Sequence, residues 1–411
     1  MAIDNKDKKV LKSSIEREQN ELACSAEREK IKGSKNLNVP HLRFPEFSGE
    51  WKETKLEKIA EITKGSGISK DQLSEHGSPC ILYGELYTKY KSEIINEVYS
   101  RTELDSSLLV KSKANDVIIP CSGETAIDIS TARCVPFNNI LLGGDLNIIR
   151  LKNNDGGFFA YQLNGTRKKD IARVAQGVSV VHLYGENLKH IRVYHPAIEE
   201  QKKITRLLSL IDERIATQNK IIEDLKKLKS AISERLFKSV KGFTVLLSDL
   251  CDIVKGKQIN GENLSDSGNY YVMNGGTEPS GYYDNYNVEA NTISISEGGN
   301  SCGYVQFNTS PFWSGGHCYS IQNIADKVDN MYLYHYLKSN EDAIMKLRIG
   351  SGLPNIQKKD LAMFKIIVPK IEWQIKISTF LSSLERKAEI EERIQNVMQK
   401  QKLYLLQQMF I

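Results

Sequence analysis

The chain has 411 residues, 40% of them hydrophobic, with 56 Lys and Arg against 51 Asp and Glu. This composition is globular, and the length predicts two or three domains. No apolar run approaches the roughly 18 residues of a membrane-spanning helix, and the first residues are charged, so we expect a cytoplasmic protein. The net charge of +5 permits a polyanionic partner without requiring one.

The first 40 residues differ from the rest of the chain. Of residues 1–35, 16 are charged, and their apolar residues are scattered. This pattern predicts a flexible charged tail, with a transient helix over residues 14–32.

Two stretches, residues 41–196 and 239–369, are rich in Gly, Tyr, Ser and Asn. Short β-prone runs alternate there with turn signals, which predicts small mixed α/β domains with long polar loops. Strands are predicted at 81–83, 116–120, 139–142, 148–150, 292–296 and 364–368. Helices are predicted over 158–164 and 331–338.

The loops of both stretches carry side chains suited to contact DNA. Arg, Lys, Asn and Gln bind base edges, whereas Ser, Thr and Tyr reach phosphates. Taken singly, each is also explained as a solvated loop residue, so the prediction rests on the pattern of two polar, basic and aromatic surfaces. The candidates in the first stretch are Lys89, Lys91, Ser122, Thr125, Arg133 and Gln176. The candidates in the second are Lys257, Gln258, Asn274, Tyr282, Tyr283, Asn300 and Arg348.

Each of these stretches is followed by a segment with the pattern of a long helix. Residues 197–238 contain neither Pro nor Gly, and residues 370–411 repeat their apolar pattern 173 positions later. Apolar residues recur at alternating spacings of four and three, which predicts a coiled-coil seam over more than four heptads. The apolar seam residues are Ile204, Leu208, Ile211, Ile215, Ile222, Leu225, Ile377, Leu381, Leu384, Met398 and Leu405.

Polar residues interrupt both seams at equivalent positions, 218 with 391 and 229 with 402, and such residues fix register. A second apolar stripe runs through Ile390, Ile394 and Val397, so the sequence does not decide which residues form the seam in the middle of the second helix. About 40 residues give roughly 60 Å of helix. We expect the two helices to pair antiparallel as a rigid spacer with a body toward each end; the alternative is a core helix inside a bundle.

The chain also matches itself over longer distances. The run Leu56-x-x-Ile59-x-x-Ile62-x-Lys64-Gly65 recurs at 247–256, 191 residues on. A second run, from Gly177 to Ile204, recurs 173 residues on from Gly350, and Gly143-Gly144 between them is answered by residues 315–316. A repeat of this length indicates a tandem domain duplication, which usually packs with pseudo-twofold symmetry.

Absent motifs narrow the function. The seven cysteines form no Cys-x-x-Cys pair, so reduced, mostly buried thiols are expected, and His317-Cys318 is interpreted as packing. The prolines are never adjacent, which removes the Asn/Asp-Pro-Pro-aromatic motif of amino-methyltransferases. A P-loop, a His-Glu-x-x-His motif and a Gly-x-Ser-x-Gly motif are also missing. The sequence predicts neither a catalytic site nor a bound metal.

Three sets of residues resemble the specificity (S) subunit of type I restriction-modification systems. The opening Val39-Pro40-His41-Leu42-Arg43-Phe44-Pro45 is similar to the start common in that family. So are the twofold Lys-Gly run and the junction Glu200-Gln201-Lys202-Lys203-Ile204 followed by Asp212. The second junction departs from the family pattern, with Trp373 where Glu is usual and Glu385 where Asp is usual. The resemblance covers nearly everything from residue 39 onward.

This resemblance implies the fold and the function. The expected fold class is α+β, with two tandem mixed α/β target-recognition domains joined by two long antiparallel coiled-coil helices with pseudo-twofold symmetry. The expected parts are a tail (1–40), domain 1 (41–196), spacer helix 1 (197–238), domain 2 (239–369) and spacer helix 2 (370–411). Each domain would read one half of a bipartite target in double-stranded DNA, as part of host defence.

The resemblance also implies the partners. The helices would set the spacer and dock two methyltransferase (M) subunits, and two restriction (R) subunits would join them. The chain itself would be non-catalytic and hold no cofactor, since S-adenosylmethionine, ATP and Mg belong to the partner subunits. Two other hypotheses remain: a coiled-coil adaptor that binds proteins without DNA specificity, and a nuclease or methyltransferase active alone.

Overall fold

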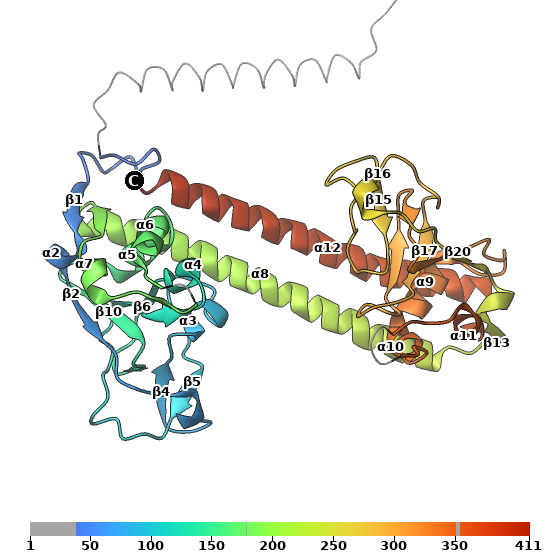
Figure 1. The fold of residues 1–411 in the computed structure, drawn as a ribbon, viewed down its shortest axis with the longest axis horizontal. Helices are drawn as coiled ribbons and strands as arrows, with labels where there is room; N and C mark the ends of the chain where they lie inside the picture. The colour runs from blue at the N-terminus through green and yellow to red at the C-terminus, as the bar shows by residue number, and fades with distance from the viewer. Residues whose placement is uncertain (1–37, 178, 351–353) are drawn as a thin grey trace, which may run out of the picture. The chain divides into compact units, whose positions relative to one another are not determined.

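The computed structural model describes residues 38–177, 179–350 and 354–411 (Figure 1). The predicted helix over 14–32 and nearly all of the predicted tail lie outside these residues. The chain divides into two compact units, which we call the first unit (up to Ile215, with Val397–Ile411) and the second unit (Ala216–Asn396). Each unit therefore combines one globular body with one end of each long helix.

The strands of the first unit form several small sheets. They are β1 (Lys52–Lys55), β2 (Ala60–Lys64), β3 (Leu73–Ser74), β4 (Ser78–Ile81), β5 (Ser100–Thr102), β6 (Asp116–Pro120), β7 (Ser122–Gly123), β8 (Arg133–Val135), β9 (Leu141–Leu142), β10 (Leu146–Leu151), β11 (Val181–His182) and β12 (Arg192–His195). Its short helices are α2 (Leu56–Ile59), η1 (Lys70–Gln72), α3 (Glu85–Thr88), α4 (Ala126–Ile129), α5 (Gly156–Asn164), α6 (Lys168–Val174) and α7 (Gly185–Lys189).

The central sheet of the first unit has the strand order β2-β10-β6-β8 and is antiparallel. Strand β6 is buried along its whole length. Because side chains alternate between faces, Val117 and Ile119 join the core under α5, while Ile118 faces the core of the second sheet, β3-β5-β4-β9. A continuous apolar run is therefore the sequence pattern of a strand covered on both faces.

The second unit repeats this plan with fewer strands. They are β13 (Phe243–Leu246), β14 (Asp252–Lys255), β15 (Tyr270–Met273), β16 (Tyr282–Tyr283), β17 (Thr292–Ser296), β18 (Val305–Asn308), β19 (Trp313–Ser314), β20 (Cys318–Gln322) and β21 (Lys365–Val368). Its short helices are η2 (Leu247–Asp249), η3 (Gly261–Asn263), α9 (Asn330–Ser339), α10 (Glu341–Met345) and α11 (Lys358–Ala362).

The sheets of the two units correspond strand by strand. The order β14-β20-β17-β18 matches β2-β10-β6-β8, and the pair β13-β21 matches β1-β12. The parallel pair β15-β19 matches the parallel pair β4-β9. This correspondence confirms the duplication that the sequence predicts.

The predicted local elements are mostly confirmed. The runs at 116–120 and 292–296 are β6 and β17, and the helices predicted over 158–164 and 331–338 are α5 and α9. The strand predicted at 81–83 is wrong after Ile81, because the next residues turn into α3. The run at 139–142 is a strand only at its last two residues.

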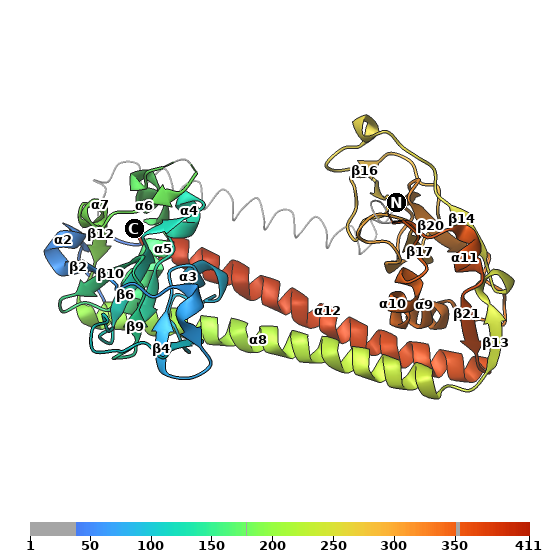
Figure 2. The same ribbon diagram turned by 60° about the horizontal axis from the view of Figure 1, so that its bottom comes forward.

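The two long helices are α8 (Ile198–Ser239) and α12 (Ile371–Gln408). Within each unit a part of α8 lies beside a part of α12 (Figures 1 and 2). In the second unit Gln218 Nε2 donates to Glu391 Oε2 at 2.6 Å and Lys229 pairs with Glu385 at 2.6 Å, so the helices run antiparallel there. Gln218 and Glu391 are the polar seam positions that the repeat makes equivalent.

Burial along the helices distinguishes the two stripes that the sequence leaves open. All eleven apolar seam residues are buried or half-buried, with Leu208 and Leu381 completely covered. In contrast, Ile390, Ile394 and Val397 are 47%, 41% and 54% exposed. The seam therefore keeps its strict repeat through the middle of α12, and the second stripe faces outward.

The end of each long helix completes the core of a body other than the one that the helix follows in the sequence. In the first unit Phe410 packs its ring against Trp51 and Phe158, with centroids 6.2 and 5.1 Å apart. In the second unit the equivalent residue, Phe237, packs against Tyr332 and Tyr336 at 5.8 and 5.2 Å. Each body therefore depends on the helix that follows the other copy.

The departure at the second junction has a structural reason. Glu200 is buried in the first unit, where it accepts two hydrogen bonds from the Arg43 guanidinium and one from Trp51 Nε1. The equivalent Trp373 is 58% exposed. The segment before β1 that supplies Arg43 and Trp51 has no copy before β13, where the chain comes directly from α8, so an acid is not required there.

Candidate nucleic-acid interface

A close backbone crossing marks the same edge of the central sheet in both units. Strand β2 continues into Gly65, where a Cβ atom would lie 1.9 Å from the carbonyl oxygen of Gly143. After β14, a Cβ atom on Gly256 would lie 2.1 Å from the carbonyl oxygen of Gly315. Only glycine fits so close an approach. We call this place the glycine crossing; it explains both repeated glycine motifs and brings several loops together.

Four of the predicted DNA contacts in the second unit gather at its glycine crossing. Asn274 Oδ1 accepts a hydrogen bond from the His317 backbone N–H at 3.1 Å, and the Gln258 amide lies against Gly316. Trp313 Nε1 donates to the carbonyl of Lys257 at 2.9 Å. The Trp313 ring meets Tyr283 edge to face at 5.1 Å. Lys257, Gln258, Asn274 and Tyr283 thus form one basic, amide-rich and aromatic surface.

A buried acid lies below this surface. Glu297 follows β17 and is 95% buried, and its Oε1 accepts from Lys255 Nζ at 2.7 Å and from the Tyr319 hydroxyl at 3.0 Å. The charge of Glu297 is balanced by Lys255, as a buried carboxylate requires. Burial and the nearby carboxylate raise the pKa of Tyr319, so its hydroxyl remains a hydrogen-bond donor to Glu297 in the pH range of the cell.

The first unit places Ser122 and Gln176 at its glycine crossing. Ser122 Oγ donates to Asp145 Oδ2 at 3.1 Å, and Ser122 pairs with His182 between β7 and β11. The Gln176 N–H donates to the His182 carbonyl at 2.9 Å. Next to them is a cleft of about 410 Å³, whose lining residues are Gly67, Ile68, Ser69, Gln72, Leu82, Tyr83, Gly143, Gly144 and Asp145.

Arg133 is buried, contrary to its prediction as a DNA contact. Its guanidinium donates to the carbonyls of Leu86 and Tyr90 at 3.1 and 2.8 Å, and burial lowers its pKa. Arg133 therefore satisfies backbone groups around α3 and serves the fold. Lys89 is also engaged near this place, since it pairs with the buried Glu85 at 2.6 Å.

The remaining candidates are distributed over the surfaces of the two units. Thr125 caps α4 by accepting a hydrogen bond from the Asp128 N–H at 3.1 Å. Lys91, Asn300 and Arg348 are exposed, and Tyr282 is half-buried in β16. Their surfaces are accessible, but nothing in the described residues brings Lys91 or Thr125 to the glycine crossing.

Sequence reasoning missed a polar network at the helix ends. In the first unit Asp212 accepts from the Tyr161 hydroxyl at 2.7 Å, and Lys402 bridges Asp212 and Glu93 at 2.5 and 2.6 Å. Burial raises the pKa of Asp212. Burial alone would lower the pKa of Lys402, but the nearby carboxylates of Glu93 and Asp212 outweigh this effect and raise that pKa. The second unit repeats the triad as Tyr334, Glu385 and Lys229. The sequence signals for it are the polar interruption of both seams at 229 and 402 and the acidic residue of each junction, Asp212 and Glu385.

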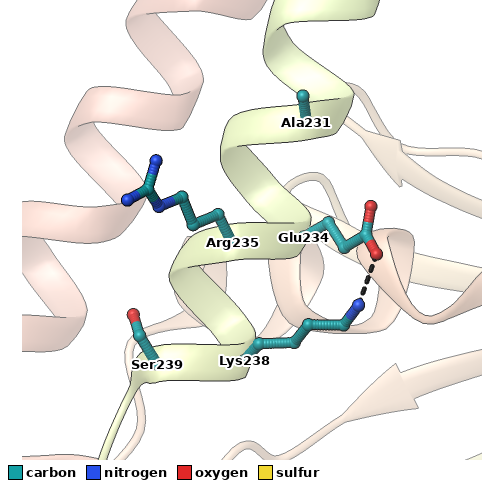
Figure 3. A pocket seen from close by; sticks show the side chains of 5 residues that line it. All are labelled: Ala231, Glu234, Arg235, Lys238 and Ser239. Atoms are coloured by element: carbon teal, nitrogen blue, oxygen red, sulfur yellow. Dashed lines mark hydrogen bonds and ion pairs between the residues drawn. The ribbon is translucent and has the colours of Figure 1, made fainter.

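A different pocket lies on the surface of α8 (Figure 3). It measures about 400 Å³ and is lined by Ala231, Glu234, Arg235, Lys238 and Ser239. Glu234 and Lys238 form an ion pair at 2.5 Å, while the Arg235 side chain extends away from them in the view. Its polar groups do not converge on one point, so we assign it no chemistry.

Within the described residues, no three His, Cys, Asp or Glu side chains are grouped so that they could hold a metal ion. No helix in the described ranges is long and apolar enough to cross a membrane.

Comparison with known proteins identifies the class. The family model for the type I restriction modification DNA specificity domain matches residues 48–227 and again residues 242–400. The chain therefore belongs to the type I restriction-modification DNA specificity family. With two copies of that domain in tandem, it is a specificity subunit of a type I restriction-modification system.

Relatives agree with this assignment, and a solved structure shares the fold. The MjaVIII type I restriction enzyme specificity subunit of Methanocaldococcus jannaschii is 22% identical over 88% of this chain and 91% of its own length. A protein of the same organism assigned as the MjaX specificity subunit is 26% identical over 64% of this chain and 69% of its own. The crystal structure of a type I S subunit from M. genitalium shares the fold, with a TM-score of 0.65 at 19% identity, over 91% of this chain and 99% of that one.

Proposed function

We propose that each unit reads one half of a bipartite target in double-stranded DNA. The observation that carries this proposal is that two copies of one scaffold present different side chains at the same glycine crossing. In the second unit that place holds Lys257, Gln258 and Asn274, whereas the first unit has Ser122, Asp145 and Gln176. Amide, basic and hydroxyl groups are those that read base edges and hold phosphates. Different surfaces predict an asymmetric target.

The long helices are proposed to set the spacer between the half-sites and to dock the methyltransferase subunits. At 1.5 Å per residue, the 42 residues of α8 are roughly 63 Å long, compared with about 34–36 Å for a turn of duplex. The outward face of α12 within the second unit carries Trp373, Phe380, Ile390 and Ile394, all 41–58% exposed. A run of exposed apolar side chains along a helix supports a protein partner.

The chain is proposed to be the non-catalytic member of the assembly. Two M subunits and two R subunits would supply the S-adenosylmethionine, ATP and Mg chemistry. The purified chain alone should then turn over neither S-adenosylmethionine nor ATP with Mg²⁺. Turnover by the single chain would support an enzyme instead.

Methylated-base sequencing tests the proposed function. DNA would be sequenced from cells that express this chain with its cognate methyltransferase. We expect a split motif with methyladenine on both strands, which also supplies the target and the spacer. If the partner is bound but no base is methylated, the result favours an adaptor without DNA specificity.

A double substitution on the outer face of α12 tests the docking role separately. Ile390→Asp with Ile394→Asp should release the methyltransferase without unfolding the chain, because both side chains are already exposed. Val397, 54% exposed on the same stripe of the helix but within the first unit, gives a second position for the same test. Retention of the methyltransferase by these variants would contradict docking through this face.

A further inference from the structure

Each unit holds a pair of solvent-accessible side chains on a short segment at the same place of the duplicated scaffold. The segment is His182-Leu183-Tyr184 in the first unit and residues 355–357, 173 positions later, in the second. The central residues Leu183 and Ile356 are fully buried. Because successive side chains of an extended segment point to opposite faces, the flanking residues point outward. His182, Tyr184 and Gln357 are exposed, and Asn355 is half-buried.

The backbone of each segment is fixed from both sides by the central sheet. The Leu183 N–H donates to the carbonyl of Cys121 at 2.7 Å, and the Leu183 carbonyl accepts from Asn147 Nδ2 at 2.9 Å. In the second unit the Ile356 N–H donates to the carbonyl of Glu297 at 2.8 Å, and its carbonyl accepts from the Tyr319 hydroxyl at 3.0 Å. A side chain that must discriminate between base edges needs such a fixed support.

Both segments adjoin the glycine crossing. His182 pairs with Ser122 between strands β11 and β7, and the Ser122 hydroxyl is hydrogen-bonded to Asp145. Asn355 forms a β-bridge with Gly298, where a Cβ atom would lie 3.8 Å from the Asn355 Cβ and 4.0 Å from His317 Nδ1. The two pairs therefore extend the two surfaces that the proposed function assigns to DNA.

The chemistry of the two pairs differs on this common frame. The rings of His182 and Tyr184 stack, with centroids 6.2 Å apart and planes 22° from parallel. The amides of Asn355 and Gln357 are joined by a hydrogen bond of 3.2 Å from Gln357 Nε2 to Asn355 Oδ1. Asn and Gln amides match the N6 and N7 edge of adenine.

We propose that these pairs determine base specificity, with Asn355 and Gln357 selecting an adenine in the half-site of the second unit. His182 and Tyr184 occupy the equivalent reading position in the first unit. This inference rests on the proposed function of the two units and names residues that select bases within it.

Single substitutions co-expressed with the cognate methyltransferase test the proposal by methylated-base sequencing. Asn355→Ala and Gln357→Ala should each lower the preference for one base pair, in one half-site, by about tenfold or more. Asn355→Asp keeps the size of the side chain and should shift that preference toward cytosine, whose N4 amino group donates a hydrogen bond to a carboxylate. The other half-site and the spacer should stay as in the wild type. The matched control is Gln322→Ala, at the opposite end of β20 from the glycine crossing, which should leave the motif unchanged.

The outcomes distinguish failure of this inference from failure of the proposed function. If the wild type methylates a split motif and all three variants keep its full base preference, the inference is overturned. If Asn355→Ala is inactive, Asn355→Asp decides, because an unchanged motif from it also overturns the inference. Failure of the proposed function is a different result, in which the wild-type complex itself yields no motif.

Discussion

The two units share their supporting parts and differ in the parts that face outward. Both have the same central sheet order, the same glycine crossing and a Tyr–acid–Lys triad at the helix ends. They differ in the sheet that carries the loops, which is β3-β5-β4-β9 in the first unit and the tyrosine-rich β16-β15-β19 in the second. Packing thus fixes the scaffold, while the exposed surface is free to change with the target.

The triads provide the sharpest way to test how far the two scaffolds are equivalent. Lys402 balances two buried carboxylates, Glu93 and Asp212, whereas Lys229 balances Glu385 alone, in a place where both side chains are 22–29% exposed. Lys402→Met should destabilise the first unit by about 3–5 kcal/mol, because it leaves buried charges unpaired. Lys229→Met should cost the second unit about 1 kcal/mol or less.

Hydrogen exchange measured by mass spectrometry would follow both triad variants, since it reports each unit separately. Faster exchange is expected in the first unit for Lys402→Met and little change in the second unit for Lys229→Met. Equal effects of the two substitutions would show that the second carboxylate beside Lys402 does not increase the stability that this lysine provides.

The seam residues Leu208 and Leu381 test the equivalence of the two cores. Both side chains are completely buried, and each joins the core of its own unit. Leu208→Ala should destabilise the first unit and Leu381→Ala the second, each by about 2–5 kcal/mol. The same exchange measurement checks this, with exposed Leu210→Ala as the control. Loss of protection in both units from either change would contradict independent cores.

A buried histidine should make the units differ in their response to acid. Burial lowers the pKa of His335 to about 4, whereas the equivalent residue of the first unit, Gln162, does not titrate. Between pH 6.5 and 4 the unfolded chain binds the proton and the folded second unit does not. The free energy of unfolding therefore decreases as the pH is lowered through this range, by at most about 3 kcal/mol. In calorimetry, His335→Gln should flatten this dependence. An unchanged slope in that variant would assign the effect to other groups.

The smallest expected effect concerns phosphate contact. Lys257→Ala should weaken binding of a duplex with the complete target and reduce the slope of log affinity against log salt by about 1. Fluorescence anisotropy at several salt concentrations measures both. Lys327→Ala, an exposed lysine of the same unit beyond the far end of β20, is the control. If both substitutions lower the slope equally, Lys257 has no particular phosphate contact.

Much of the scaffold could be predicted from the sequence, because packing leaves periodic signals. The seam spacing and the glycine repeats indicated the helices and the duplication. The sequence could not separate the seam of α12 from the stripe through Ile390 and Ile394, since both are apolar at helical spacing, and only one faces a neighbour.

The surface was harder to predict, because burial of a polar residue depends on distant partners. Arg133 reads as a basic loop residue, yet the carbonyls of Leu86 and Tyr90 hold it inside. His182 and Asn355 carry no motif, and their place becomes visible only when their buried neighbours are bonded to the central sheet.

An exchange of one unit's body tests the central claim most directly. Residues 239–369 would be replaced by the same region of a relative with a different target, and the methylated motif of the hybrid complex would be sequenced. If each unit reads its own half-site, only one half of the motif should change, while the other half and the spacer stay. A change in both halves would contradict the account.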